Sequence, residues 1–262
     1  MNRIERDPPA GLPQVTLAPG ALDQRAAPLP EGPLKFEVIA VYAHDPDAFT
    51  QGLVWADGTL YESTGLYGHS TVRRIDLQTG ETTASATLDD RYFGEGLELV
   101  GDQLVQLTLK SQIALICDTD TLALVGWLPY EGDGWGLCQL DTDTLVTSDG
   151  SDTLTFRNAT TFEPVGTINI TDNGEPVDQI NELECVGHDI WANVWQTDTI
   201  IRIDSTTGRI RSTLDTSDQL RANEPGDAGV LNGIAYLPER QSFLLTGKNW
   251  ANLYEILIAA GS

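Results

Sequence analysis

The stretch INELECVGHDIWANVWQTDTIIRID, residues 180–204, contains three short runs of β-branched, aliphatic and aromatic residues separated by polar turns. Runs of this length and spacing indicate three consecutive β-strands. The pattern recurs four more times, at 49–76, 92–118, 133–158 and 231–256. Each copy has one equivalent aliphatic residue, and successive ones are 44, 40, 46 and 51 residues apart. They are Leu53, Leu97, Leu137, Leu183 and Ile234. That period is typical of a four-stranded β-propeller blade.

A fourth strand follows the third in the first four units, in the runs TTASATL, ALVGWL, PVGTINI and RIRSTL. The fifth unit has no strand after its third. A spare run, KFEVIAVYA at 35–43, precedes the first unit and can supply the missing outer strand. The sequence therefore predicts an all-β fold, a five-bladed β-propeller whose ring is closed by an N-terminal strand and has no unpaired seam.

The domain organisation follows from the composition of the N-terminus. Residues 1–33 are rich in Pro, Ala and Gly, and we expect them to form a flexible leader without structure of its own. Residues 34–262 then form a single propeller domain. The leader lacks the apolar run of a signal peptide but is compatible with the start of a mature exported chain, so we expect a secreted or periplasmic location.

The charge of the chain limits its partners. Thirty-nine acidic and fifteen basic residues among 262 give a net charge of −24. Nucleic acid and anionic membranes are therefore poor partners, because phosphate groups are bound by Lys and Arg. No apolar run approaches the length of a transmembrane helix. We expect a monomer.

The cysteines and histidines give no sign of a metal site or cofactor. Cys117, Cys138 and Cys185 are few and widely spaced, so we expect three free thiols. The three histidines show no HxH or HExxH spacing, which argues against a His-bound catalytic metal.

One residue in each unit stands at the start of the strand that should line the channel. These five equivalent positions are Gln51, Glu95, Trp135, Asn181 and Asn232. Turn chemistry alone can explain an Asn or Gly at one such position. Five polar or aromatic side chains at the same position favour a lined pocket. The turns between the second and third strands reach the same face, and they add Leu109, Trp195, Lys248 and Trp250.

Glu95 is the only acid in this ring of five, within the run FGEGLE. Its flanking glycines, Gly94 and Gly96, allow close backbone approach and leave space beside the carboxylate. Phe93 should point to the same side, as should Phe49 relative to Gln51. Desolvation between aromatic groups should raise the pKa of Glu95 and suit it to proton transfer near neutral pH. Glu98, on the opposite face, is interpreted as structural.

The motifs HDPDAFTQGLVW, FGEGLE, DGWGL, INELE, ANVW and TGKNW resemble those of the plant-type glutaminyl-peptide cyclotransferases over about residues 36–257. The resemblance implies a five-bladed propeller that converts the N-terminal glutamine of peptides or proteins to pyroglutamate and releases ammonia, without a catalytic metal. It implies that Glu95 is the catalytic glutamate. It assigns the substrate pocket to Phe49, Gln51, Phe93, Trp135, Asn181, Trp195 and Lys248. The family usually has LTWK where this chain has LTLK, so Leu109 should leave one pocket wall thinner.

Two other functions remain open at this stage. A non-catalytic propeller could bind peptides or glycans at the channel mouth, since fold does not fix function. A calcium-dependent propeller hydrolase or lactonase would need several carboxylates converging on the channel, and the predicted ring has one.

Overall fold

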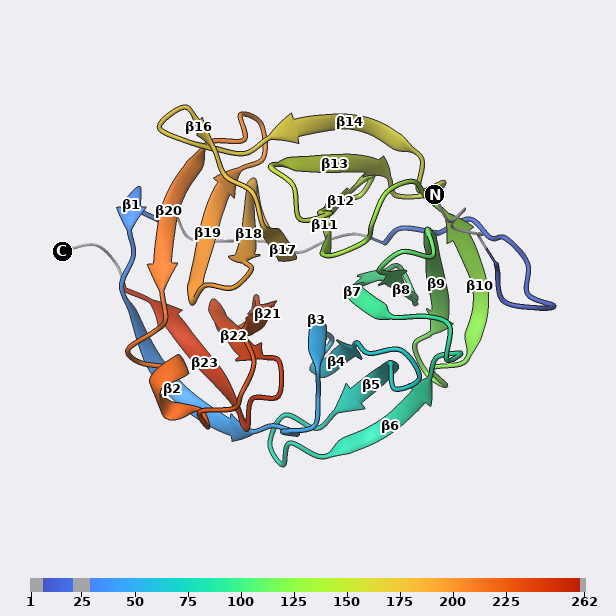
Figure 1. The fold of residues 1–262 in the computed structure, drawn as a ribbon, viewed down its shortest axis with the longest axis horizontal. Helices are drawn as coiled ribbons and strands as arrows, with labels where there is room; N and C mark the ends of the chain where they lie inside the picture. The colour runs from blue at the N-terminus through green and yellow to red at the C-terminus, as the bar shows by residue number, and fades with distance from the viewer. Residues whose placement is uncertain (1–6, 21–28, 260–262) are drawn as a thin grey trace.

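The computed structural model describes residues 7–20 and 29–259. Five antiparallel sheets stand around a central channel, as Figure 1 shows. This confirms the predicted five-bladed propeller. In each blade the first strand contacts its counterparts in the neighbouring blades, so these five strands line the channel: β3 (Thr50–Ala56), β7 (Gly94–Val100), β11 (Leu137–Asp141), β17 (Ile180–Val186) and β21 (Leu231–Leu237).

The remaining strands follow in order from the channel outward. In the first blade these are β4 (Thr59–Thr64), β5 (Thr71–Ile75) and β6 (Thr82–Thr87). In the second they are β8 (Gln103–Thr108), β9 (Ile113–Asp118) and β10 (Leu124–Pro129). In the third they are β12 (Thr144–Thr147), β13 (Thr153–Asn158) and β14 (Pro164–Asn169). In the fourth they are β18 (Asp189–Val194), β19 (Thr199–Asp204) and β20 (Ile210–Asp215).

The fifth blade closes the ring. Its strands β22 (Ser242–Gly247) and β23 (Asn252–Ile258) are followed by β2 (Phe36–Ala43), which pairs antiparallel with β23. The predicted N-terminal closing strand is therefore confirmed. A short hairpin, β15 (Thr171–Asp172) and β16 (Glu175–Pro176), links the third and fourth blades. The helix at Arg221–Asn223 is a single 3-10 turn, and no helix in the described part of the chain could span a bilayer.

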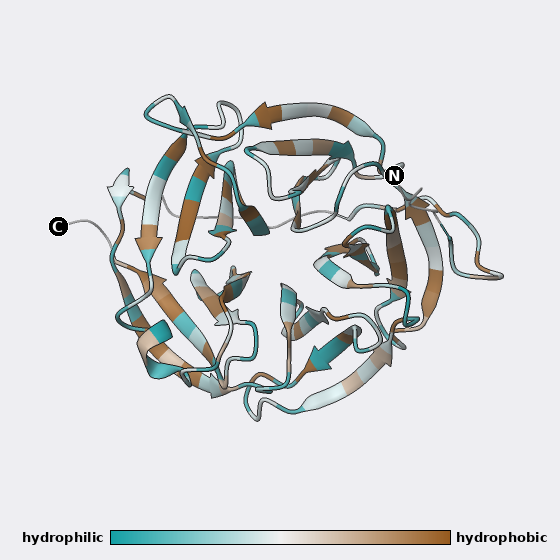
Figure 2. Ribbon diagram, viewed as in Figure 1, coloured by the Kyte–Doolittle hydropathy of each residue, from teal (hydrophilic) through white to brown (hydrophobic). Residues whose placement is uncertain are grey.

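The hydrophobic core lies between blades. Alternation along the strands gives each blade two apolar faces, and each face packs on the next blade. Val54 and Val72 of the first blade, for example, pack with Leu97 and Leu104 of the second. Along β20 buried residues alternate with partly buried or exposed ones, and Figure 2 shows hydrophobic and hydrophilic bands on this strand. The apolar pattern that predicted the strands therefore also holds the ring together.

The N-terminal segment differs from the expected flexible leader. Leu17 is buried with residues of the second and third blades, and Val15 N donates to Trp127 O at 3.2 Å. The short strand β1 (Gly32–Pro33) pairs parallel with β20. Outer strands offer unpaired backbone groups, and an extended Pro-rich chain can use them. The expectation is thus corrected for residues 7–20 and 29–33; residues 1–6 and 21–28 lie outside the described residues.

The cysteines also differ from expectation. Cys138 and Cys185 form a disulfide, with their Cα atoms 5.4 Å apart and a sequence separation of 47. Cys117 is a buried free thiol. The prediction of three free thiols was wrong because it considered spacing along the chain, whereas β11 and β17 lie side by side in the channel wall.

Candidate active site

A cavity of about 500 Å³ opens where the channel strands begin. Nine of the residues singled out in the sequence line it: Phe49, Gln51, Phe93, Glu95, Leu109, Trp135, Asn181, Trp195 and Lys248. Sequence analysis missed four others: Lys110, Asp133, Gly229 and Val230. Lys110 and Asp133 belong to the runs LTLK and DGWG, so the same motifs carried a signal for them.

Close backbone contact between blades explains the glycines beside Glu95. A Cβ atom at Gly96 would lie 2.6 Å from the carbonyl oxygen of Trp135, to which Gly96 N donates a hydrogen bond. A Cβ at Gly94 would lie 2.5 Å from Nε2 of Gln106. The two glycines therefore let β7 approach its neighbours closely. The carbonyl oxygen of Glu95 accepts a hydrogen bond from Ser63 Oγ, which fixes the backbone at this residue.

The carboxyl group of Glu95 is buried, with 4% of the residue exposed. Burial raises its pKa well above 4.5, and the nearby charge of Asp133 acts in the same direction. The Lys248 ammonium opposes this shift. Burial lowers the pKa of Lys248, while the charge of Glu95 raises it. A carboxyl group with a raised pKa can both accept and return a proton near neutral pH.

Aromatic rings form the walls around the carboxyl group. Phe49 and Phe93 meet edge to face with centroids 6.2 Å apart, and Trp135 and Trp195 do so at 5.6 Å. The Lys248 Nζ atom lies 4.8 Å from the centroid of Phe49, in cation–π geometry. The walls therefore form a small apolar enclosure with few polar groups, which restricts the orientation of a bound ligand.

Two hydrogen-bond donors point to ligand recognition. Nε1 of Trp135 is buried and has no partner among the described residues. Asn232 Nδ2 donates to the carbonyl oxygen of Thr50 at 3.0 Å and to Oε1 of Gln51 at 3.2 Å. Because Gln51 accepts with its oxygen, its Nε2 remains as a donor for a ligand. A buried donor without a protein partner is costly, so Nε1 of Trp135 suits a polar ligand.

Two of the predicted residues stand behind the cavity. Asn232 is fully buried and orients Gln51 without lining the cavity itself. Trp250 is also fully buried, and its Nε1 donates to the carbonyl oxygen of Gly229. The repeat alignment located both near the channel mouth. The alignment does not determine which side chains line the cavity.

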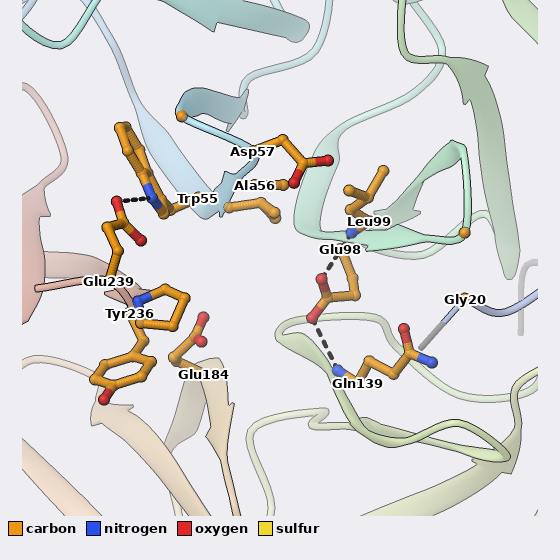
Figure 3. A pocket seen from close by; sticks show the side chains of 14 residues that line it. Gly20, Trp55, Ala56, Asp57, Glu98, Leu99, Gln139, Glu184, Tyr236 and Glu239 are labelled. Carbon is orange, nitrogen blue, oxygen red and sulfur yellow. Dashed lines mark hydrogen bonds between the residues drawn. The ribbon is translucent and has the colours of Figure 1, made fainter. Parts of the chain in front are cut away.

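A second hollow, of about 690 Å³, lies where the channel strands end (Figure 3). Glu98 and Glu184 face it from β7 and β17. The Glu98 carboxylate accepts hydrogen bonds from the backbone of Leu99 at 2.7 Å and of Gln139 at 2.8 Å. Burial raises the pKa of Glu98 to about 7. Within residues 7–20 and 29–259, no group of three or more His, Cys, Asp or Glu side chains is arranged to hold a metal ion.

Comparison with known proteins gives consistent matches. The family model described as glutamine cyclotransferase matches residues 15–258. The chain is 40% identical over 233 residues to a glutaminyl-peptide cyclotransferase of Arabidopsis thaliana. The matched region covers 87% of this chain and 72% of that protein. The crystal structure of a Myxococcus xanthus glutaminyl cyclase superposes with a TM-score of 0.81 at 33% identity, covering 89% of this chain and 100% of that one.

Proposed function

The chain belongs to the glutamine cyclotransferase family, and we propose that it cyclises the N-terminal glutamine of peptides or proteins through a single general acid–base, Glu95, without a catalytic metal. Family membership supports the overall reaction. The assignment of Glu95 rests on one observation. Its carboxyl group is buried within an aromatic cavity that also contains an unpartnered hydrogen-bond donor, Nε1 of Trp135.

The reaction joins two groups of the same residue. The neutral α-amine attacks the side-chain amide carbon, and a five-membered lactam ring begins to form. The ionised Glu95 accepts the proton that the amine loses. It then gives this proton to the amide nitrogen, the carbon–nitrogen bond breaks, and ammonia leaves. One proton is taken and one is returned, so a single carboxyl group is sufficient.

The cavity supplies orientation and charge stabilisation. The aromatic walls hold the amine close to the amide, which converts much of the entropic cost of reaction into binding. As the amine attacks, negative charge develops on the amide oxygen. Nε1 of Trp135, Nε2 of Gln51, the side chain of Asn181 and the Lys248 ammonium are the donors available to stabilise it.

The proposal is tested by ammonia release from a glutaminyl dipeptide, measured against the slow cyclisation that occurs without enzyme. The matched control is the same dipeptide with an acetylated α-amine, which cannot cyclise. Release from both peptides would indicate an amidase, and release from neither would favour a non-catalytic binding protein. A second series includes a chelator, with the melting temperature followed in parallel. Loss of activity in protein that stays folded would contradict metal-independent catalysis.

We also propose that the protein works outside the cytoplasm, in a secreted or periplasmic location. The Cys138–Cys185 disulfide supports this, since such bonds persist mainly in oxidising compartments. Protein isolated from its native cell with thiols trapped by alkylation should carry one reactive cysteine after denaturation. Three alkylated cysteines would contradict the proposal.

A further inference from the structure

The seam between the last blade and the first contributes two of the site residues. The segment 44–49 leads from β2 into β3 and runs against the turn 247–251. His44 N donates to the carbonyl oxygen of Ala251 at 2.9 Å, and Asn249 N donates to that of Ala48 at 2.7 Å. Phe49 stands on one of these segments and Lys248 on the other. Their position relative to Glu95 therefore depends on how firmly the seam is held.

The buried side chain of His44 bridges this seam. Its Nδ1 lies 2.9 Å from the carbonyl oxygen of Trp250, and its Nε2 lies 3.0 Å from Oε1 of Glu62. A carbonyl oxygen and a carboxylate oxygen can only accept hydrogen bonds. Both ring nitrogens must therefore donate, and His44 is an imidazolium. The hydroxyl of Thr246, 3.4 Å from Nδ1, does not alter this because it can accept as well.

Glu62 provides the fixed end of the bridge. It is fully buried in the first blade and also accepts hydrogen bonds from Thr50 Oγ1 at 2.6 Å and from Nε of Arg73 at 3.1 Å. Asp45 completes the cluster through Arg73. Burial alone would lower the pKa of His44, but the Glu62 carboxylate outweighs it and the pKa is raised. Burial likewise opposes ionisation of Glu62, yet His44 and Arg73 lower its pKa to about 2.

We propose that His44 is a positioning residue for the cyclisation reaction: its imidazolium clamps the turn 247–251 of the last blade to Glu62 of the first, and this contact sets the place of Lys248 beside Glu95. The inference rests on the proposed function. The side chain of His44 does not line the cavity, so it acts through the Trp250 carbonyl and the turn that carries Lys248.

Two substitutions separate the ends of the clamp. In His44→Asn the side-chain amide can replace the Nδ1 donor and keep the bond to the Trp250 carbonyl. In His44→Gln the longer amide can replace the Nε2 donor and keep the bond to Glu62. Each variant keeps only one end of the clamp, so we expect both to lose about 10–100-fold in kcat, because small displacements of catalytic groups are costly. His188→Asn, at an exposed histidine of the fourth blade, is the matched control.

The readouts are kcat per folded molecule, KM and melting temperature. A purely structural role predicts lower melting temperatures for both His44 variants with wild-type kcat at a temperature where both are folded. That result would overturn the proposal. Wild-type kcat in His44→Gln, which lacks the bond to the Trp250 carbonyl, would also overturn it.

Nitrogen-15 NMR of the wild-type imidazoles tests the clamp even if the variants fail to fold. The chain has only three histidines, so His44 can be assigned with His69 and His188 variants. We expect both nitrogens of His44 to be protonated at neutral pH. A neutral ring would overturn the proposal. If the wild-type protein released no ammonia, the proposed function would fail, while this NMR result would still report on the clamp.

Discussion

Each mouth of the channel has a buried glutamate of β7, but the surroundings of the two glutamates differ. Glu95 and Glu98 stand three positions apart on β7, and burial raises the pKa of both carboxyl groups. Glu98 is held by two backbone N–H groups at the mouth where the channel strands end. Glu95 lies among aromatic walls, a lysine and the unpartnered Nε1 of Trp135 at the other mouth. Surroundings therefore decide which carboxyl group is suited to move a proton.

The largest effect should come from changing the two glutamates separately. Glu95→Gln preserves size but removes the proton carrier, so turnover should fall by about 10²–10⁴-fold. The KM should change much less, because the aromatic walls remain. Glu98→Gln is the matched control on the same strand and should leave turnover nearly intact. The measurement is ammonia release corrected for spontaneous cyclisation. A Glu95→Gln enzyme with the wild-type rate would contradict the assignment of Glu95, and not Glu98, as the proton carrier.

Loss of the Cys138–Cys185 disulfide should lower the stability of the channel wall between the two mouths. The bridge closes a loop of 47 residues, which corresponds to about 4 kcal/mol in the chain-entropy model. We expect Cys138→Ser to lower the free energy of unfolding by up to about that amount. Cys117→Ser, at the free thiol, is the control. Denaturant unfolding measures the difference. Equal stabilities for Cys138→Ser and the wild-type protein would show that the bridge contributes nothing.

The pH dependence of turnover should show how the charge of Lys248 affects the pKa of Glu95. Glu95 must be ionised to accept a proton, so kcat falls as pH drops through its pKa, which lies above 4.5. Lys248→Met removes the charge that lowers this pKa. The pKa of Glu95 then rises, and the acid limb of kcat moves to higher pH. The profile is recorded at saturating substrate for both enzymes. A limb that stays in place or moves to lower pH would contradict the electrostatic account.

The smallest effect should come from Leu109, where the family usually has tryptophan. Leu109→Trp restores an aromatic wall, and aromatic contacts contribute about 0.5–1.5 kcal/mol beyond area burial. We therefore expect KM to fall by about 2–10-fold with little change in kcat. Steady-state kinetics on a glutaminyl dipeptide measure both. A higher KM together with a lower kcat would mean that the cavity has no room for the larger ring.

The ring and the cavity around Glu95 could be predicted from the sequence because the repeats place equivalent residues at the same end of each channel strand. Glu95 and Trp135 were located in this way, as was the closing strand. The disulfide was not, because it depends on the lateral register of β11 and β17 in neighbouring blades. The side chain of Asn232 was located beside the cavity, but it contacts Gln51 and does not line the cavity itself. The orientation of a side chain depends on the neighbouring strands and blades that pack against it, and the sequence alone does not specify these contacts.

The pairing of β2 with β23 has a consequence for synthesis of the chain. Phe36 pairs with Ile258, so β2 is synthesised well before β23, its partner. Contacts this distant in sequence slow folding, because the whole intervening chain must be arranged before they form. During that interval β2 is an unpaired apolar edge. Lys35 and Glu37, both exposed beside Phe36, place charges on this edge that discourage pairing with another nascent chain.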